Sequence, residues 1–364
     1  MTIRAASRVR HGLATSSSAA AGADGPAETA SAANAAGAAS APRTPSAAAE
    51  DRRSPDQTYL TFPEWYLVHS PAEYAAYLGR GGPPSAFPLF AHVGQFWSGY
   101  GAVNREIERY PFNGGYHLMV MVIGTSTTVE YGLKGLYERT IGRLAEATRT
   151  GSEPVPEERQ HAALAQAYVD FIRVEPWYLF DFMTPLRRLW AGLPLAGPNL
   201  LRRWERRFAL SSELLVKEGY ARLIKLGSQS VYEAPKPVTA VVLSRAPLAD
   251  PDRHPDYVAR AAGGSDVLAT VPRYAAFTGY SRWLAGQGID FREIAGNDGE
   301  VLVSLLVAER WLPPATARLV LEQPILTRPG TKRAVLAVPV GALAALLRTA
   351  AAARDVVVEH IYDF

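Results

Sequence analysis

Apolar residues recur at helical spacing from Thr58 onward, which indicates where the folded part of the chain begins. Pro63 suits the first turn of one helix, and the sequence Ser-Pro-x-Glu at residues 70–73 is a capping box that predicts the start of a second. Longer amphipathic helices are predicted at residues 87–110, 116–147, 157–173 and 198–228. Residues 58–235 are therefore expected to form a mostly helical bundle.

Runs of apolar and β-branched residues replace the helical spacing after Pro235. Strands are predicted at residues 238–243, 291–294, 301–307, 318–326, 333–340 and 355–363, and helices at residues 272–285 and 341–353. The turns at 296–299 and 328–330 predict two hairpins because Gly, Asn and Asp tolerate positive φ. The predicted class is α+β, in which the helical bundle is followed over residues 236–364 by a ferredoxin-like α/β sandwich with an extra strand or hairpin. No internal repeat of useful period is evident.

The first fifty residues differ in composition, since 19 are Ala, 7 are Ser and none is aromatic. Such a segment cannot bury enough apolar surface to fold, so residues 1–57 are predicted to be a disordered leader. Arg4, Arg8 and Arg10, with no acidic residue before Asp24, are typical of an organelle transit peptide. The favoured interpretation is that the composition of this segment is a general bias of the sequence and that the segment has no targeting role.

Composition excludes several classes of function. The chain has 364 residues, 48% of them hydrophobic, which is enough for one large core or two ordinary ones. Its net charge of +3 is too small to indicate a nucleic-acid-binding protein. The absence of Cys removes disulfides, thiolate metal sites and Cys nucleophiles, and leaves cytoplasmic and peripheral-membrane locations both open. No phosphate-binding loop, nucleophile elbow or HExxH helix occurs in the sequence.

Residues 110–129 form a run of twenty without a charged side chain, which is the length of a bilayer-spanning helix. The run also contains Pro111, His117, several Gly residues and four consecutive hydroxyl residues. Its continuous apolar part is therefore short, and a buried bundle helix is favoured over a spanning one.

Aromatic and Arg side chains interleave between Trp177 and Phe208. The residues predicted to bind a lipid or a protein partner are Trp177, Arg187, Arg188, Trp190, Arg202, Arg203, Trp204, Arg206 and Arg207. Rings at headgroup level and guanidinium groups on phosphates suit an anionic lipid surface, and another protein can use the same groups. Nucleic acid fits less well. The leading hypothesis is a non-enzymatic, membrane-peripheral or protein-binding module, and the competing interpretation places the rings in the core with the Arg residues on a solvated face.

Five titratable residues lie among apolar neighbours in the predicted bundle, namely Glu64, His69, His92, His117 and Glu130. Their spacing matches no metal motif, so the sequence predicts no metal site and names no cofactor. If the fold brought them together, they would form the site of an enzyme or of a carrier of haem or a metal, which is the alternative hypothesis. The structural interpretation makes each a bonded core residue, with Glu130 paired to Lys134 one turn onward.

The chain resembles an uncharacterised bacterial family of hypothetical proteins in four segments: TFPEWYLVHSPAEY, YHLMVMVIGTSTTVEYGLK, YVDFIRVEPWYLFDF and VEHIYDF. The resemblance covers about residues 57–364. It implies that the helical and α/β parts form one architecture, and it slightly favours membrane association. It implies no activity and no functional residue.

Overall fold

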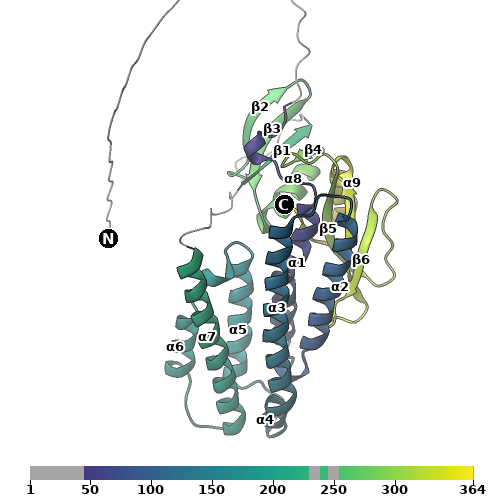
Figure 1. Ribbon diagram of the computed structural model, residues 1–364. Coiled ribbons are helices and arrows are strands. Elements are labelled where there is room, and N and C mark those ends of the chain that lie inside the picture. The colour runs from purple at the N-terminus through teal and green to yellow at the C-terminus, as the bar shows by residue number, and fades with distance from the viewer. Residues whose placement is uncertain (1–44, 229–237, 245–253, 364) are drawn as a thin grey trace, which may run out of the picture. The chain divides into compact units, whose positions relative to one another are not determined.

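A computed structural model of the chain describes residues 45–228, 238–244 and 254–363 (Figure 1). Its N-terminal part is helical, with α1 (Gln57–Gly79), α2 (Leu89–Ile107), α3 (Gly114–Tyr137), α4 (Arg143–Ala147), α5 (Pro156–Ile172), α6 (Met183–Ala191) and α7 (Leu200–Ser228). Short 3-10 turns lie at Ala49–Asp51, Pro84–Ala86 and Trp177–Leu179, and a π-helical turn at Glu138–Gly142 joins α3 to α4. The predicted helical part is confirmed. Of the disordered leader predicted over residues 1–57, residues 1–44 lie outside the described residues. The prediction is wrong for residues 45–57, which include the Ala49–Asp51 turn and are held by a hydrogen bond of 2.8 Å from the N–H of Ala47 to Glu293.

α1 is one continuous helix, although the capping box predicted a second helix start near Pro71. Pro63 and Pro71 both lie inside α1, where each removes one backbone hydrogen bond. The helix continues because 14 of its 23 residues are buried, so packing outweighs the lost bonds. The Ser70 hydroxyl caps no helix and instead lies 2.8 Å from the Tyr131 hydroxyl on α3.

Among the described residues, the C-terminal part contains two antiparallel four-stranded sheets. The first, ordered β2-β3-β1-β4, consists of β1 (Val238–Ser244), β2 (Val258–Gly263), β3 (Asp266–Pro272) and β4 (Phe291–Ile294). The second, ordered β6-β7-β5-β8, consists of β5 (Glu300–Ala308), β6 (Arg318–Pro324), β7 (Thr331–Pro339) and β8 (Val356–Ile361). Helix α8 (Ala275–Gly286) precedes β4, and α9 (Val340–Ala352) precedes β8. The mixed helix and sheet class is confirmed, but a ferredoxin-like arrangement is not.

The hairpin predicted at residues 296–299 is wrong. β4 pairs with β1, whereas β5 pairs with β7 and β8, so this turn passes from one sheet to the other. The hairpin predicted at residues 328–330 is confirmed as the pair β6-β7. β2 and β3 were not predicted. The sequence of β2 is Ala-rich and contains only one β-branched residue, Val258, which is a weak strand signal.

The two sheets repeat one topology. Each is built from three consecutive strands, a helix and a fourth strand, and in each the fourth strand pairs with the first. α8 packs against α9, and one hydrophobic core runs from Val241 in the first sheet to Leu336 in the second. The sequence carries no matching repeat, so this duplication is visible only in the strand order.

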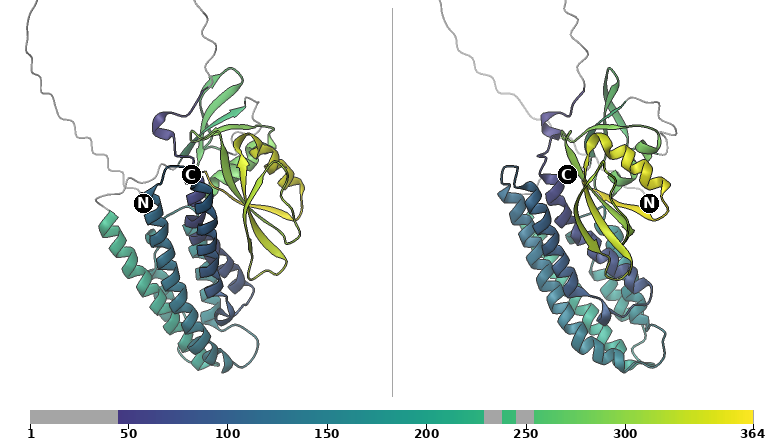
Figure 2. Two further views of the ribbon diagram at one scale, coloured as in Figure 1. Left: turned by 45° about the vertical axis from the view of Figure 1, so that its right-hand side comes forward. Right: turned by 90° about the vertical axis from the view of Figure 1, so that its right-hand side faces the viewer.

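α1 and α2 lie against the second sheet (Figure 2). The Thr58 hydroxyl on α1 donates to the carbonyl of Tyr362 at 2.8 Å and accepts from the N–H of Leu302 at 2.9 Å. On α2, Gln95 donates its side-chain amide to the carbonyl of Pro324 at 2.7 Å. The described helices and sheets therefore belong to one compact unit.

Candidate functional site

The five titratable residues of the predicted bundle site lie in separate networks. Among the described residues, no hydrogen bond or ion pair joins any two of them. Glu64 accepts a hydrogen bond from the Tyr116 hydroxyl at 2.6 Å, and burial raises the pKa of its carboxyl group. His117 Nδ1 lies 2.7 Å from the Tyr100 hydroxyl.

His69 belongs to a buried network between α1 and β8. Its Nε2 lies 2.9 Å from the Tyr362 hydroxyl, and its Nδ1 lies 3.5 Å from a carboxylate oxygen of Glu359. Arg333 donates two hydrogen bonds to the same carboxylate, at 2.6 and 2.7 Å. Burial lowers the pKa of His69 to about 4, so the ring is neutral at pH 7. These contacts join α1 to the second sheet.

His92 belongs to another buried network, between α1 and α2. Its Nδ1 lies 2.9 Å from the Tyr66 hydroxyl and 3.1 Å from the Ser70 hydroxyl, while Glu73 lies 3.7 Å from Nε2. Burial lowers the pKa of His92 to about 3. No group of three His, Asp or Glu side chains in the described part of the chain could hold a metal ion. The structure therefore does not gather the five residues into one site.

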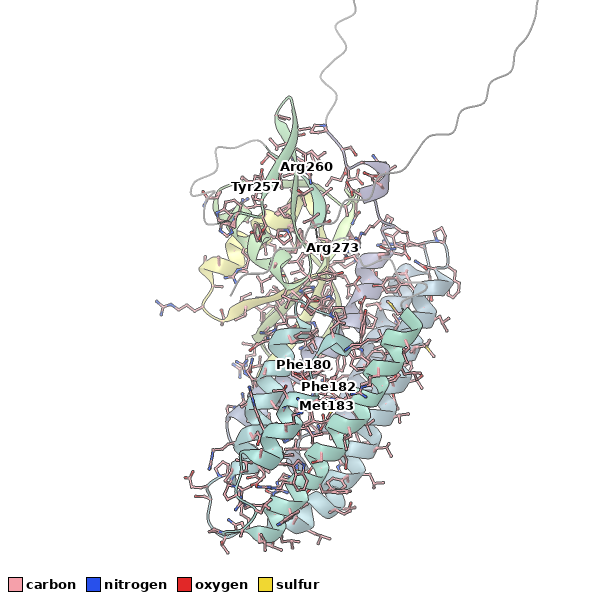
Figure 3. All side chains as sticks on the ribbon, turned by 90° about the vertical axis from the view of Figure 1, so that its left-hand side faces the viewer. Phe180, Phe182, Met183, Tyr257, Arg260 and Arg273 are labelled. Carbon is pink, nitrogen blue, oxygen red and sulfur yellow. The ribbon has the colours of Figure 1, made fainter. Side chains whose placement is uncertain are left out.

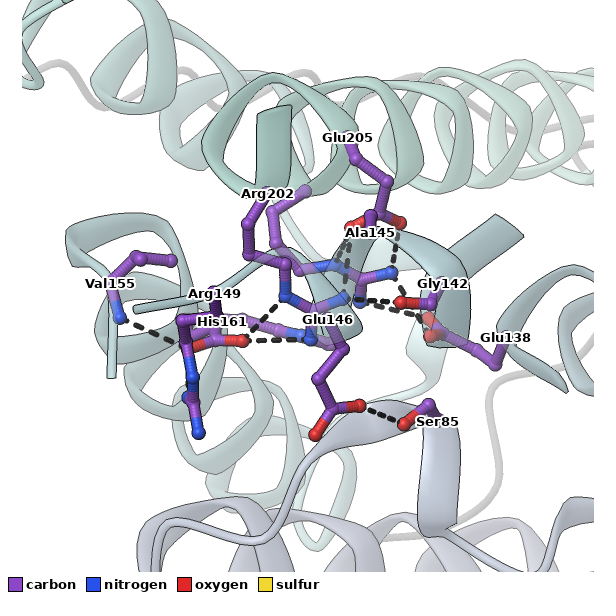
Figure 4. A network of polar contacts seen from close by, with 12 residues as sticks. Ser85, Glu138, Gly142, Ala145, Glu146, Arg149, Val155, His161, Arg202 and Glu205 are labelled. Atoms are coloured by element: carbon purple, nitrogen blue, oxygen red, sulfur yellow. Dashed lines mark hydrogen bonds and ion pairs between the residues drawn. The ribbon is translucent and has the colours of Figure 1, made fainter. Parts of the chain in front are cut away.

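The four α7 arginines of the predicted basic surface, Arg202, Arg203, Arg206 and Arg207, are buried. Arg202 donates to Glu158 at 2.8 Å and to Glu205 at 3.0 Å, and Figure 4 shows this network beneath α7. Arg206 makes a two-point contact with Glu138 at 2.8 and 3.0 Å.

Arg203 and Arg207 share one carboxylate, that of the fully buried Glu157, at distances of 2.8 to 3.2 Å. Arg207 also donates to the carbonyl of Pro194 at 2.7 Å. Four arginines thus meet four glutamates in the interior. The prediction that these four arginines form an exposed surface is wrong because acidic residues far upstream neutralise them inside the bundle.

The π-helical turn completes this network. Its last residue, Gly142, accepts a hydrogen bond from Arg202 at its carbonyl at 2.9 Å. A Cβ at position 142 would clash with the Glu138 carboxylate, which the contact with Arg206 holds in place, so glycine permits this close approach. The widened turn therefore brings acid and carbonyl groups to the α7 arginines.

The remaining residues of the predicted surface keep some exposure. Arg187 and Arg188 on α6 are exposed. Trp190 and Trp204 are 44% and 42% exposed and pack edge to face, with ring centroids 5.8 Å apart. Trp177 is half-buried and packs against Tyr220 of α7.

The outer face of α7 is apolar, opposite to its buried charges. Between Leu200 and Tyr220 every exposed residue of α7 is uncharged. These residues are Leu200, Leu201, Trp204, Phe208, Ser212, Leu215, Val216, Gly219 and Tyr220. α7 also buries Leu210 and Leu214, but over this stretch the charged residues on its exposed side that are expected in water are missing.

α3 has a similar outer face. Between Leu118 and Leu136, Glu130 is the only exposed charged residue of this helix. The favoured interpretation of residues 110–129 as a buried helix is wrong for one face, since Leu118 is 67% exposed. None of the helices in the described ranges is long and apolar enough to cross a bilayer.

A large cleft lies between α3, α7 and the Trp177–Leu179 turn. Its volume is about 1840 Å³, and it is lined mainly by apolar side chains that include Val122, Leu133, Phe208 and Val216. Pockets for drug-sized ligands span about 300–1,000 Å³. The cleft is therefore large enough for a molecule with long hydrocarbon chains.

Charged residues also line the cleft, and four of them, Glu130, Lys134, Glu213 and Lys217, form one ion-pair network. Lys134 donates to Glu213 at 2.9 Å, and Lys217 contacts Glu213 at 2.9 Å and Glu130 at 3.0 Å. Burial alone would raise the pKa of Glu213, but the two lysines hold it well below its usual range. The predicted pair of Glu130 with Lys134 is wrong, because both residues find their partners on α7.

A small internal cavity of about 60 Å³ adjoins the cleft and shares these four charged residues with it. His161 of α5 lines the cavity and is 4% exposed. Its Nε2 lies 3.4 Å from the Tyr74 hydroxyl, and its Nδ1 has no hydrogen-bond partner among the described residues. Burial keeps the pKa of His161 well below its usual range. Phe180 and Phe182 also line the cavity, and Figure 3 shows where these two residues lie in the helical part.

The chain matches no protein-family model, no curated protein and no solved structure.

The sequence did not single out His161, Glu213 or Lys217 as site residues. Glu213 and Lys217 stand one turn apart on α7, in phase with Arg202 and Arg206, so the sequence does hold a charged stripe. The missing information was that this stripe faces inward. His161 carries no local signal, because it becomes notable only through the cavity in front of it.

Proposed function

We propose that the protein is membrane-peripheral, that the outer faces of α3 and α7 enter the lipid, and that the cleft between them takes up a lipid hydrocarbon chain. The observation that carries this proposal is the polarity of α7. The four arginines in its N-terminal half are buried against carboxylates, while Leu215 and Leu223 are 53% and 66% exposed. Burying charges while exposing leucines is unfavourable in water and favourable against hydrocarbon.

A lipid partner explains the surface better than a protein partner does. Protein interfaces generally surround an apolar centre with a polar rim. Here the helices on both sides of the cleft are themselves apolar and exposed, with Leu118 and Leu136 on α3 and Leu223 on α7. α7 has 29 residues and so measures about 43 Å, which allows a long contact parallel to a membrane surface.

Trp190 and Trp204 support the same orientation. Both side chains expose part of their rings, while the indole N–H of Trp190 donates to the Ser211 hydroxyl at 3.0 Å and that of Trp204 to the Leu195 carbonyl at 3.2 Å. Tryptophan is enriched at the boundary between lipid and water. The exposed Arg187 lies on the adjacent α6, where it can reach headgroup phosphates.

Liposome flotation tests the proposal. The full chain is expected to float with phosphatidylcholine vesicles and to stay bound in about 1 M salt, where the screening length is only about 3 Å. Leu215→Glu combined with Leu223→Glu is expected to abolish flotation, because both carboxylates would enter the apolar layer. Neither leucine lines the cleft, so this change leaves the ligand site intact.

Leu312→Glu is the matched control, since Leu312 is 80% exposed but lies between β5 and β6, far from α7 in sequence. It is expected to float like the unmodified chain. Binding that disappears in high salt, or a leucine face buried between two copies in a stable dimer, would overturn the proposal.

A further inference from the structure

The cleft ends in a polar feature that a chain-binding groove does not need. Apolar walls are enough for a groove that binds hydrocarbon alone. The wall of this cleft, however, includes an ion-pair network in which Lys134, Lys217 and Glu213 are largely buried, which is costly, and Glu130 is partly exposed. Behind them lies the small cavity with His161. The cleft and the cavity share Glu130, Lys134, Glu213 and Lys217, so these side chains stand between the two spaces.

We propose that the cavity beside His161 binds the uncharged, oxygen-bearing head of the molecule whose chain occupies the cleft, such as an alcohol, an ester or another carbonyl compound. The inference rests on the proposed function for the chain and adds the chemical class of the head.

Unused hydrogen-bonding capacity supports a polar head. His161 Nδ1 is buried and has no hydrogen-bond partner in the described part of the chain. The Lys134 ammonium has three N–H donors, of which Glu213 takes one, and its nitrogen lies 4.5 Å from the centre of the Tyr74 ring. Buried polar atoms without partners are rare, so a ligand group that hydrogen-bonds to His161 Nδ1 would be favourable. Lys134, which lines the same cavity, has further N–H donors for such a head.

The charge balance of the site selects a neutral head. Lys134 and Lys217 carry two positive charges, and Glu130 and Glu213 carry two negative ones, so the quartet already sums to zero. His161 is neutral at pH 7 because its pKa is well below its usual range. A charged head would enter a low-dielectric site with no counter-ion left for it.

The size of the cavity limits the head further. A cavity of about 60 Å³ has room for about four water molecules, and so for a head of a few heavy atoms. A hydroxyl or an ester carbonyl fits this space. A phosphocholine or a sugar does not.

Competition binding with the full chain tests the inference. N-phenyl-1-naphthylamine reports occupation of the cleft, and hexadecan-1-ol, hexadecane and hexadecanoate at pH 8 are compared as displacing ligands of equal chain length. Hexadecan-1-ol is expected to displace the dye at about a tenfold lower concentration than the other two, which corresponds to one net hydrogen bond. His161→Phe fills the cavity and is expected to remove this preference while leaving hexadecane binding unchanged.

His161→Gln keeps a hydrogen-bonding group and is expected to retain most of the preference for the alcohol. Two results on the unmodified chain would overturn the inference: equal displacement of the dye by the alcohol and the alkane, or tightest binding of hexadecanoate. This test therefore does not depend on whether either variant folds. A chain that binds none of the four compounds would overturn cleft binding itself, and flotation reports membrane contact separately.

Discussion

α7 and α9 are both amphipathic helices, but they are oriented in opposite ways. α9 buries Leu343 and Leu347 against the core that joins the two sheets and exposes Arg348. α7 buries Arg206 and exposes Leu215. α9 is therefore oriented for water, whereas the outer face of α7 is oriented for an apolar surrounding.

The difference between α7 and α9 shows that amphipathic spacing defines two faces of a helix but does not determine which face is buried. α9 obeys the usual assignment because apolar β7 and β8 cover it. On α7 the inside is decided by Glu138 and Glu157, which lie on other elements and attract the arginines inward. Counter-charges elsewhere in the chain can therefore reverse the assignment.

The largest expected effect comes from removing the acid that two arginines share. Glu157→Ala leaves Arg203 and Arg207 buried without their carboxylate, and the free energy of unfolding is expected to fall by about 3–5 kcal/mol. Denaturant titration followed by circular dichroism measures it. Glu218→Ala, which breaks the pair with the 68% exposed Arg222, is the matched control and is expected to cost less than about 1 kcal/mol. Equal effects of the two changes would mean that the arginines are solvated.

The same long-range pairing explains what the sequence could and could not predict. The bounds of α2, α5 and α7 followed from local spacing, and so did the hairpin β6-β7. The inward direction of Arg206 depends on Glu138, 68 residues upstream, and no local pattern contains that contact. The hairpin prediction at residues 296–299 was wrong for a similar reason. Turn residues predict that the chain reverses direction, but they do not determine which strand each flanking strand pairs with.

The interior of the bundle also holds groups that can lose or gain charge, unlike the arginines. Burial lowers the pKa of His92 to about 3, whereas an unfolded histidine titrates near 6.5. The folded state therefore binds fewer protons than the unfolded state between these values, so stability is full above pH 6.5 and falls as the pH falls. Between pH 6.5 and pH 4.5 the loss from His92 is expected to be about 2 kcal/mol.

His92→Gln isolates this contribution to the pH dependence. The difference in unfolding free energy between the unmodified chain and the variant is expected to shrink as the pH falls from 6.5 to 4.5. Asp363 acts in the opposite direction, because burial raises its pKa to about 7 and its protonation stabilises the folded state as the pH falls. It is present in both proteins and so cancels in the difference. A difference that stays constant with pH would mean that His92 is protonated without cost.

The smallest expected effect on stability comes from a substitution on the outer face of α7, and it gives the most direct comparison with α9. Leu215→Ser on the outer face of α7 is expected to change the free energy of unfolding in membrane-free buffer by no more than about 0.5 kcal/mol, because the side chain is already 53% exposed. Leu347→Ala on α9, where the leucine is 2% exposed, provides the comparison and is expected to cost about 2–5 kcal/mol. With phosphatidylcholine vesicles present, Leu215→Ser is expected to weaken binding of the protein to the vesicles. Leu347→Ala is not expected to remove a lipid contact, because Leu347 is buried in the core. If Leu215→Ser destabilised the isolated chain as strongly as the α9 change, the outer face of α7 would already be packed against protein, and its apolar residues would need no membrane.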